Sequence, residues 1–333
     1  MKSFLHLHDQ DDATIRALLC SAAAIERAPI SDALKGRVLG LVFLNPSLRT
    51  LASFQAGMAQ LGGSSFVITP GQGTWALETR DGVVMDGAAA EHVREAVPVL
   101  CQYADALGVR CFAGGADLNL DLTEPVLSAF ARHATKPLVN MESALDHPCQ
   151  ALADWKTMDD LDIPQSGRFV LSWAWHPKAL PYAVPSAALS MAARRGMKVT
   201  VLRPEGYALP AAVMERAREQ AARSGGCVRE TSDRAAALDG AHVLYAKSWQ
   251  AEAHYGRPES EAALRAPLRD WCVAESWFET ARKDAVFMHC LPVRRNVKVK
   301  DEVLDGPRSR VIRQAGNRLH AQKAVLLHML ETQ

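Results

Sequence analysis

Three segments of the sequence place side chains that bind anions or donate hydrogen bonds where a helix begins or a strand ends. The first is the run Asn-Pro-Ser-Leu-Arg-Thr at 45–50, which follows a short apolar run and precedes an amphipathic helix. Free N–H groups at a helix N-terminus, two hydroxyls and a guanidinium together make an anion site suited to phosphate. A Ser cap followed by a solvated Arg is the alternative that this segment alone leaves open.

The second segment is the run His-Pro-Cys-Gln at 147–150, at the start of another expected helix. Pro148 suits the first helical position, so His147 lies just outside the helix. The imidazole and the Gln150 amide then point off the helix N-terminus toward a ligand placed there. Taken alone, a capping His and a solvated Gln fit the segment better.

The third segment is the run His-Cys-Leu-Pro at 289–292, at the end of an expected buried strand. Open α/β sheets bind ligands at this carboxyl edge. Pro292 stops the ladder, so the carbonyls of Cys290 and Leu291 are left to accept hydrogen bonds from a ligand NH2 group. Cys290 could also be a nucleophile, but nothing in the sequence marks a reactive thiolate, and a buried structural thiol is favoured.

The elements that position these segments alternate between short apolar runs and amphipathic patterns, as in parallel sheets with helices on both faces. We predict an α/β fold with two domains, 1–148 and 149–315, and a C-terminal helix at 316–333 that packs back on the first. The segment 250–268 is expected to be a loop because Gly and Pro interrupt it. Expected strands lie at 38–44, 65–68, 106–112, 137–141, 169–173, 198–202, 242–246 and 285–289, and expected helices at 49–61, 91–104, 122–133, 148–161, 183–195, 210–224 and 316–331.

Composition limits the class of protein. Of 333 residues, 48% are hydrophobic and 23% are charged, which suits large cores and not a disordered chain. A net charge of +1 without a long basic tract argues against a nucleic-acid partner. We find neither a signal-peptide core nor an apolar run long enough to span a membrane, so we expect a cytoplasmic protein with no membrane partner.

Several common site types are disfavoured. The seven scattered cysteines include no C-x-x-C pair, which argues against a disulfide framework and a zinc site, and most are expected in cores. Neither a G-x-G-x-x-G run nor a Walker-type G-x-x-x-x-G-K run follows the expected strands. A nicotinamide or ATP enzyme is therefore disfavoured.

Taken together, the motifs S-x-R-T at 47–50, H-P-x-Q-x-L-A-D at 147–154 and H-C-L-P at 289–292 resemble those of the aspartate/ornithine carbamoyltransferase family in order and spacing. The resemblance covers nearly the whole chain, including Asn-Arg-Leu-His at 317–320. It implies a carbamoyl phosphate-binding domain, an acceptor-binding domain, interdomain helices that join them, and a homotrimer with shared active sites. The implied reaction transfers a carbamoyl group from carbamoyl phosphate to an amine and needs no metal or organic cofactor.

Within the family, further segments most resemble transcarbamylases that act on N-acylated ornithine, and the S-M-G loop that holds free ornithine is not visible. This likeness favours acetylornithine or succinylornithine as the acceptor and a place in arginine biosynthesis. The segments are Val84–Gly87 followed by Glu91 and His92, Asn140–Glu142, Trp173–Lys178, Tyr245–Trp249 and Arg294–Lys298.

For carbamoyl phosphate, the resemblance implies that the phosphate binds segment 47–50, with Arg318 closing on it and Arg110 bridging phosphate and carbonyl. His147 would join Arg110 and Thr50 in donating hydrogen bonds to the carbonyl oxygen as it becomes an oxyanion. The implied donor-binding residues are Ser47, Leu48 through its backbone, Arg49, Thr50, Trp75 from a neighbouring subunit, Arg110, His147, Gln150, Cys290, Leu291 and Arg318, of which Arg49, Thr50, Arg110, His147, Gln150 and Cys290 are the catalytic set.

For the acceptor, the resemblance implies a pocket with two cations suited to a carboxylate. Outside the family context each cation would be a weak candidate, because a lone Lys or Arg is generally a solvated surface charge. Lys298 matches a lysine that can be carboxylated in similar enzymes, and a simple surface Lys is the alternative. The implied acceptor residues are Glu142, His176, Lys247, Leu291, Arg294 and Ala90.

Ala90 is expected near the acyl tail of the acceptor, where acetyl-type enzymes tend to carry Glu and succinyl-type enzymes Pro. A Glu there would repel a second carboxylate. Ala90 removes that repulsion without supplying an attraction, so we expect a succinyl group to be tolerated, with acetyl still accepted. The alternative is a helix-favouring Ala at the start of the helix at 91–104.

Departures from the family pattern put the acceptor pocket in more doubt than the donor site. Leu51 and Gln55 replace an Arg–Glu pair four residues apart, Pro181 replaces an Asn, and Gln314 and Gly316 replace acidic residues.

Two other functions stay open. One is a carbamoyltransferase for ornithine or another amine, and the other is a noncatalytic paralogue that binds a partner protein or senses carbamoyl phosphate.

Overall fold

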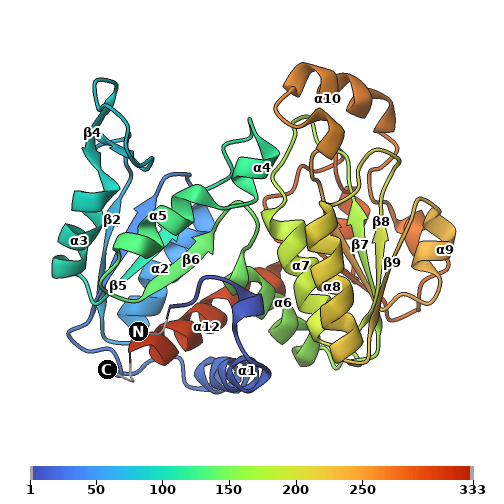
Figure 1. The fold of residues 1–333 in the computed structure, drawn as a ribbon. Coiled ribbons are helices and arrows are strands. Elements are labelled where there is room, and N and C mark those ends of the chain that lie inside the picture. The colour runs from blue at the N-terminus through green and yellow to red at the C-terminus, as the bar shows by residue number, and fades with distance from the viewer. Residues whose placement is uncertain (1–2, 331–333) are drawn as a thin grey trace. The chain divides into compact units, whose positions relative to one another are not determined.

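The computed structural model describes residues 3–330, which divide into two compact units (Figure 1). Unit 1 comprises the chain up to Gly114, Asn119–Lys156, and the part from Asn317 onward; unit 2 comprises Gly115–Leu118 and Thr157–Gly316. Along the chain, helices α6 (Pro148–Asp160) and α12 (Val311–Leu330) contribute residues to both units. No helix within 3–330 is both long and apolar enough to cross a bilayer.

Unit 1 is built on a four-stranded parallel sheet in the order β2-β1-β5-β6. Strands β5 and β6 are buried along their whole length, and β1 nearly so, as expected of a parallel sheet covered on both faces. The register pairs Phe43 with Arg110 and Arg110 with Glu142, so the carboxyl ends of three strands meet at one edge. The strands are β1 (Val38–Phe43), β2 (Ser64–Ile68), β5 (Ala106–Arg110) and β6 (Leu138–Glu142).

Helices cover this sheet because each buries an apolar stripe. A continuous core joins Val93 and Val97 of α3 and Phe130 of α5 to the strands. Helix α2 packs against α12, since a Cβ added at Gly57 would lie 3.2 Å from Cγ of Lys323. Besides the four strands of this sheet, the elements wholly within unit 1 are η1 (Leu7–Asp9), α1 (Asp12–Arg27), α2 (Leu48–Gln60), β3 (Ala76–Glu78), β4 (Ala89–His92), α3 (Val93–Tyr103) and α5 (Pro125–His133). A short helix, α4 (Leu118–Asp121), spans a unit boundary along the chain.

Unit 2 has a five-stranded parallel sheet in the order β11-β10-β7-β8-β9. Its central strands are buried, and the register pairs Lys247 with Trp173 at their carboxyl ends. The segments that follow these two strands, which begin at Ala174 and Ser248, therefore start at the same edge of the sheet. The elements are β7 (Arg168–Trp173), α7 (Ala183–Arg194), β8 (Lys198–Leu202), α8 (Ala211–Arg223), β9 (Cys227–Thr231), α9 (Arg234–Leu238), β10 (Val243–Lys247), η2 (Glu252–His254), α10 (Pro258–Arg265), η3 (Ala266–Leu268), η4 (Glu275–Phe278), β11 (Val286–Met288) and α11 (Asp301–Leu304).

The predicted fold class is confirmed, since both sheets are parallel and flanked by helices. The prediction of a loop over 250–268 is wrong, because the segment contains α10. Pro258 occupies the first turn of that helix, where its missing N–H costs nothing, and Glu261 pairs with Arg265 one turn later. The prediction also missed α1 and β9, and it began α12 at residue 316 instead of Val311.

We predict that Gly40→Val lowers the free energy of unfolding by about 1–3 kcal/mol, because overpacking a dense core strains its neighbours. A Cβ at Gly40 would lie 2.7 Å from Cδ2 of Leu107 and 2.8 Å from Cζ of Phe66. Urea denaturation of both proteins measures the change. Gly316→Ala is the control, because a Cβ on this exposed helical residue meets nothing within 4 Å. The control should raise stability by about 0.5–1 kcal/mol. Equal stability of Gly40→Val and the native chain would contradict this packing.

Candidate functional site

The N-terminus of α2 in unit 1 presents two hydroxyls and a buried guanidinium. Ser47 caps the helix, accepting the Thr50 N–H at 3.3 Å and donating to Thr50 Oγ1 at 3.0 Å. Nη2 of Arg318, from α12, donates to the same Thr50 Oγ1 at 2.8 Å. Thr50 and Arg318 are both buried. The alternative of a Ser cap is thus correct, because Ser47 caps the helix. The Thr50 hydroxyl also accepts from Arg318, a second cation that the segment 45–50 alone did not reveal.

Three guanidinium groups, those of Arg49, Arg110 and Arg318, form what we call the arginine cluster. Burial, together with the charges of Arg110 and Arg49, lowers the pKa of Arg318 to about 10 against the opposing effects of Cys149 and Glu142. Nε of Arg110 and Nε of Arg318 are buried, and within residues 3–330 neither has a hydrogen-bond partner. Repelling cations with unused donors favour the binding of an anion.

Glu142 offsets part of this positive charge. Its Oε2 accepts a hydrogen bond from Nη1 of Arg110 at 2.5 Å and lies 3.6 Å from Nε2 of His147. The Arg110 guanidinium also lies over the ring of Phe112, 4.6 Å from its centroid. Glu142, predicted as an acceptor-binding residue, therefore lies in unit 1 beside two predicted donor-binding residues. His147 itself is buried and precedes α6, as the position of Pro148 predicted.

Gln150 is held in one orientation by a residue of its own helix. Its Nε2 donates to Oδ1 of Asp154 at 2.7 Å, and both side chains are about 1% exposed. Its buried Oε1 has no hydrogen-bond partner within the described chain. The group left for a ligand is therefore an acceptor, which suits an NH2 group. The prediction of a solvated Gln is wrong, because this turn of α6 is buried.

The sequence reasoning missed two carboxylates that orient this site. Asp154 fixes Gln150, and Oδ1 of Asp146 accepts the backbone N–H of His147 at 2.7 Å. The i,i+4 spacing of Gln150 and Asp154 on a helix was a signal that could have found the first contact. Asp146 offered a weaker signal, because its contact depends on how the chain turns before α6.

Unit 2 holds a second polar cluster at the carboxyl edge of its sheet, formed by His176, Lys247, Arg294 and Lys298. Nε of Arg294 donates to Nε2 of His176 at 3.2 Å, and Nδ1 of His176 lies 2.9 Å from the Lys178 carbonyl. Burial lowers the pKa of His176 to about 4, and the charges of Lys298, Arg294 and Lys247 contribute. His176 is therefore uncharged at neutral pH, and its Nε2 accepts the hydrogen bond from Arg294.

Lys298 is buried, so its alternative prediction as a surface Lys is wrong. Burial lowers its pKa well below the usual value, the charge of Lys247 lowers it further, Cys290 opposes these effects, and Arg294 contributes to the lowering. A buried Lys298 with a lowered pKa beside two cations makes this cluster suited to hold negative charge.

The backbone at 289–292 turns sharply, and Cys290 in this turn lies near Lys298 of the cluster. Leu291 has φ of +57°, a left-handed conformation that is uncommon for a side chain of this size, and its N–H donates to Nδ1 of His289 at 2.8 Å. The His289 N–H donates in turn to Oε1 of Gln314 at 2.9 Å. Gln314, noted as a departure from the family pattern, thus supports the turn. Cys290 is buried, in agreement with the structural-thiol alternative.

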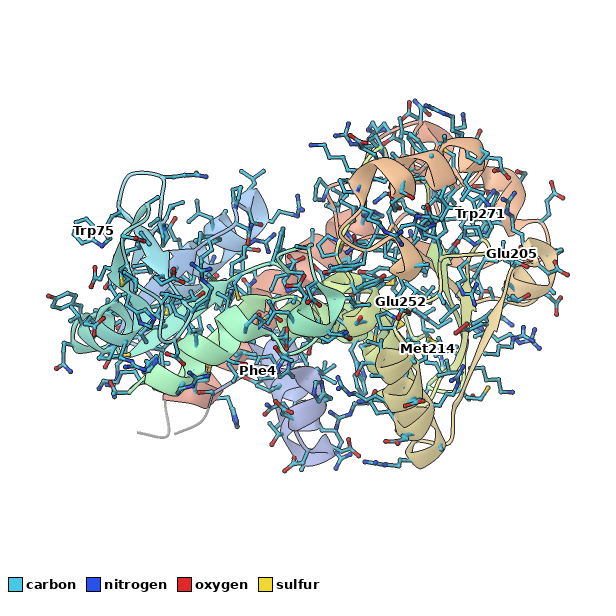
Figure 2. All side chains as sticks on the ribbon, turned by 45° about the horizontal axis from the view of Figure 1, so that its top comes forward. Phe4, Trp75, Glu205, Met214, Glu252 and Trp271 are labelled. Atoms are coloured by element: carbon cyan, nitrogen blue, oxygen red, sulfur yellow. The ribbon has the colours of Figure 1, made fainter. Side chains whose placement is uncertain are left out.

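Trp75 and Ala90 lie in an exposed part of unit 1. The Trp75 ring is 59% exposed, projects from the end of the unit (Figure 2), and donates from Nε1 to Oε2 of Glu91 at 2.6 Å. Ala90 lies in β4, and α3 begins only at Val93 with His92 as its cap, so the alternative of a helical Ala90 is wrong.

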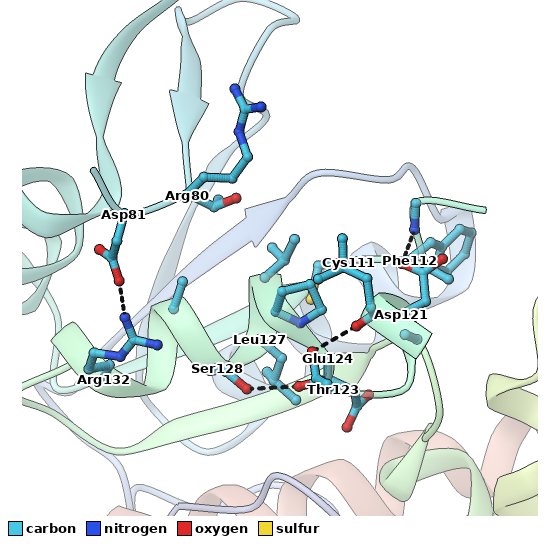
Figure 3. A pocket seen from close by; sticks show the side chains of 18 residues that line it. Arg80, Asp81, Cys111, Phe112, Asp121, Thr123, Glu124, Leu127, Ser128 and Arg132 are labelled. Atoms are coloured by element: carbon cyan, nitrogen blue, oxygen red, sulfur yellow. Dashed lines mark hydrogen bonds and ion pairs between the residues drawn. The ribbon is translucent and has the colours of Figure 1, made fainter. Parts of the chain in front are cut away.

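A separate cavity of about 590 Å³ in unit 1 contains none of the predicted site residues (Figure 3). It is lined by apolar side chains of α5 and by the turn after β5, and Arg132 pairs with Asp81 at its rim. Its chemistry does not match an anion site, so the arginine cluster remains the donor-site candidate.

Family models match both parts of the chain. Residues 2–160 match the carbamoyl-P binding domain of aspartate/ornithine carbamoyltransferase, and residues 183–329 match its Asp/Orn binding domain. The chain belongs to the aspartate/ornithine carbamoyltransferase family. It is accordingly an enzyme of the transferase class.

Individual relatives narrow the comparison to one branch of the carbamoyltransferases. The chain is 41% identical over 330 residues to an N-acetylornithine carbamoyltransferase of Xanthomonas campestris, covering 98% of this chain and 97% of the relative. It is 35% identical to an N-succinylornithine carbamoyltransferase of Bacteroides thetaiotaomicron, covering 99% of each. A crystal structure of an N-acetyl-L-ornithine transcarbamylase variant with carbamyl phosphate and N-succinyl-L-norvaline matches with a TM-score of 0.96 at 41% identity, covering 99% of this chain and 100% of that one.

We predict that Arg294→Gln raises the pKa of His176, because it removes a positive charge and a donor that stabilises the neutral imidazole. An NMR titration of the ring protons of His176 measures the change from its native midpoint of about 4. Arg223→Gln, on an exposed residue of α8, is the matched control and should leave the midpoint unchanged. A native midpoint near the ordinary His value would show that this cluster is not assembled as described.

Proposed function

We propose that the chain transfers the carbamoyl group of carbamoyl phosphate to the δ-amine of an N-acylated ornithine, acetylornithine or succinylornithine, and releases phosphate and the N-acylcitrulline. The observation that carries the proposal is the arginine cluster at the N-terminus of α2, where two guanidinium Nε atoms are buried without a hydrogen-bond partner within the described chain. The names and ligands of the relatives support the choice of donor and acceptor.

For the donor, the phosphate would bind the helix N-terminus at Ser47, Leu48, Arg49 and Thr50. Arg318 is already hydrogen-bonded to the Thr50 hydroxyl, so its charge is held next to the expected phosphate. Arg110 would move from Glu142 toward the ligand or share its donors between them. Charge-assisted contacts of this kind contribute about 1.5–3 kcal/mol each.

For the carbamoyl group, Gln150 is oriented to accept from the NH2 through Oε1 because Asp154 holds its Nε2. The carbonyls of Cys290 and Leu291 would be further acceptors. His147, Arg110 and Thr50 would donate to the carbonyl oxygen, and each well-placed donor to a developing oxyanion lowers the barrier by about 3 kcal/mol.

The transfer then proceeds by addition and elimination. The δ-nitrogen lone pair attacks the carbonyl carbon, the oxygen becomes an oxyanion, and its collapse breaks the bond to the phosphate oxygen. The attacking amine has an ordinary pKa of about 10.4, by analogy with Lys, so it must lose one proton before attack and a second afterwards. The departing phosphate, with a second pKa of about 6, can take one of them. None of these steps requires a metal or organic cofactor.

For the acceptor, the cationic cluster of unit 2 supports binding of a carboxylate. Arg294 and Lys247 supply positive charge, and the neutral His176 can accept or donate a hydrogen bond without adding to the charge. Lys298 is a candidate for carboxylation, because burial favours its neutral amine, the form that reacts with CO2, and the resulting anion would face two cations. Glu142 would meet the amine end of the acceptor if it is released by Arg110.

We further propose that the enzyme is a cytoplasmic homotrimer of arginine biosynthesis with active sites shared between subunits. Unit 1 exposes several large apolar side chains, and exposed apolar surface suits a protein interface. Trp75 is among them, which supports its predicted reach into a neighbouring site. The exposed large apolar residues of unit 1 are Ile30, Leu48, Val67, Trp75, Val84, Met85, Val99, Tyr103 and Leu120.

We predict that Arg49→Ala weakens carbamoyl phosphate binding at least tenfold, because a charge-assisted contact worth about 1.5–3 kcal/mol is lost. Isothermal titration calorimetry of the variant measures the affinity, and circular dichroism should show an intact fold. Arg27→Ala, on an exposed Arg in the last turn of α1, is the control and should bind as the native enzyme does. Unchanged affinity of Arg49→Ala would refute the phosphate site and with it the proposed function.

We predict that Ala90→Glu lowers the ratio of kcat/KM for succinylornithine to that for acetylornithine by about tenfold or more, because the added carboxylate repels a second one. A ureido assay with both substrates measures the ratio. Ala222→Glu, on an exposed face of α8, adds the same charge elsewhere and should leave the ratio unchanged. If Ala90→Glu also leaves the ratio unchanged, residue 90 does not face the acyl group. Turnover of free ornithine alone would instead favour the ordinary ornithine enzyme.

A further inference from the structure

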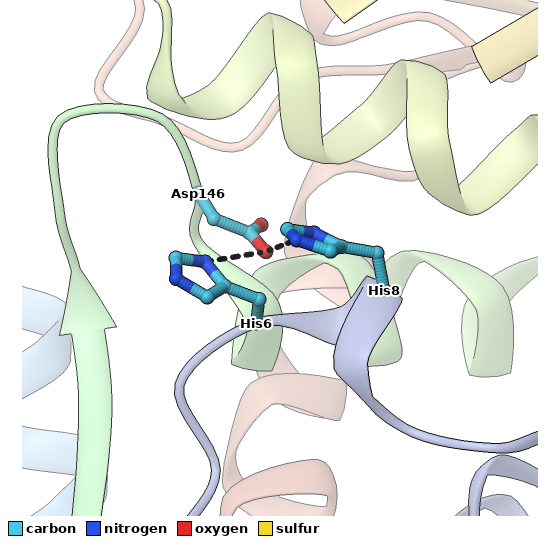
Figure 4. A group of neighbouring side chains, drawn as sticks. All are labelled: His6, His8 and Asp146. Carbon is cyan, nitrogen blue, oxygen red and sulfur yellow. Dashed lines mark ion pairs between the residues drawn. The ribbon is translucent and has the colours of Figure 1, made fainter. Parts of the chain in front are cut away.

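A cluster of two imidazoles and a carboxylate lies in unit 1, where the N-terminal segment passes the turn before α6 (Figure 4). Nδ1 of His6 lies 3.5 Å from Oδ2 of Asp146, and Nδ1 of His8 lies 4.0 Å from the same oxygen. The two rings are stacked, with centroids 4.8 Å apart. One ligand atom from each residue falls within a sphere small enough for a single ion, since all three lie within 4.8 Å of one another.

The outer nitrogen of each ring faces its own carboxylate. Nε2 of His6 lies 3.1 Å from Oε2 of Glu124, and Nε2 of His8 lies 3.5 Å from Oδ1 of Asp9. A carboxylate beside Nε2 favours the tautomer with the proton on that nitrogen, which directs the Nδ1 lone pair toward Asp146. Metal-binding histidines are oriented in this way, with the non-coordinating N–H donated to a carboxylate.

The lone pairs of both Nδ1 atoms and of Oδ2 of Asp146 therefore face one another. Nδ1 of His6 is buried and has no hydrogen-bond partner within residues 3–330, because 3.5 Å is too long for a good hydrogen bond to Asp146. Oδ2 of Asp146 accepts the Leu7 N–H at 3.1 Å, which leaves it a further lone pair. Facing lone pairs repel unless a cation lies between them.

The field at this point is strongly negative. Carboxylate oxygens of Glu124, Asp146 and Asp9 lie 3.1 Å, 3.5 Å and 3.5 Å from imidazole nitrogens of His6 and His8. The cation that this field attracts is either a proton on His6 or a metal ion shared by both rings. Nδ1 of His8 faces the same Asp146 oxygen as Nδ1 of His6, and an ion shared by both rings accounts for this arrangement.

We propose that His6, His8 and Asp146 form a binding site for one divalent transition-metal ion of the Zn²⁺ type, with water as the fourth ligand. Two imidazoles and a carboxylate are a usual ligand set for Zn²⁺, at metal–ligand distances of about 2.0–2.2 Å. In a tetrahedron of that size the ligand atoms lie about 3.3 Å apart, so small rotations of the rings would complete the site. The side chains of His6 and His8 are 18% and 25% exposed, which leaves a route for the ion and the water.

The ion would act on the neighbouring donor site through Asp146. While Oδ2 binds the metal, Oδ1 of the same carboxylate holds the backbone N–H of His147. A bound ion would therefore fasten the N-terminal segment to the turn that carries His147. Binding of the ion itself requires neither carbamoyl phosphate nor an acceptor, so its failure would leave the proposed transferase function untouched.

The test is a calorimetric titration of the full chain, stripped of metal with a chelator, with ZnCl2 at pH 7.5 in a phosphate-free buffer. We expect one ion per chain, and at least tenfold weaker binding in each of His6→Asn and His8→Asn. His254→Asn, which removes an imidazole hydrogen-bonded to Ser260 in unit 2, is the matched control and should bind as the native chain does. Asp9→Asn should weaken binding by a smaller factor, since it removes only the carboxylate beside His8.

The outcomes separate a metal site from its alternatives. Failure of the native chain to bind Zn²⁺, or unchanged affinity in His6→Asn, would overturn the proposal. Unchanged affinity in His8→Asn would also overturn it and would leave a proton on His6 as the cation. Co²⁺ gives a second measurement on the native chain: a visible band at one equivalent without a thiolate charge-transfer band supports the site, and a thiolate band places the ion on cysteine instead.

Discussion

Repulsion among the three guanidinium groups of the arginine cluster is the constraint on which the donor half of this molecule depends. Arg318 is buried beside Thr50, and its lowered pKa records both the loss of water and the nearby charges of Arg110 and Arg49. Glu142 cancels part of that charge through Arg110. This contact is possible because β5 and β6 end side by side, with Arg110 and Glu142 paired in their register. An anion completes the balance, which ties the fold of unit 1 to the phosphate chemistry proposed for it.

Most of the architecture could be predicted because each buried strand is a run of apolar residues and each covering helix has its own apolar stripe. β9 was missed because it is a partly exposed edge strand with the polar sequence Cys-Val-Arg-Glu-Thr, which has no apolar run. The sequence pattern does not reveal α10, because a Pro within a segment usually interrupts a helix, whereas Pro258 starts this one. Both errors arise where tertiary context, not local pattern, decides the element.

The candidate site was predictable at the level of motifs and not at the level of contacts. Ser47 and Thr50 belong to one helical turn, so their pairing follows from spacing. The hydrogen bond from Arg318 to Thr50 joins residues 268 positions apart and depends on how α12 packs on α2. The burial of Lys298 could not be predicted either, because it lies in a loop segment whose polar neighbours suggest exposure. Side-chain environments of this kind are fixed by packing, and a single sequence carries no direct record of it.

The hydrogen bond between Gln150 and Asp154 has a consequence for discrimination between activated acyl donors. With its Nε2 engaged, the Gln150 amide cannot flip to offer a donor, so the proposed site would present a buried oxygen to the incoming group. A carbamoyl donor would meet that oxygen with an N–H, whereas acetyl phosphate would meet it with a methyl group of nearly the same size. Leaving a buried acceptor unpaired costs about 1–3 kcal/mol. The hydrogen bond within one turn of α6 would thus disfavour acetyl phosphate, which is too similar in size to carbamoyl phosphate to be excluded by steric clash.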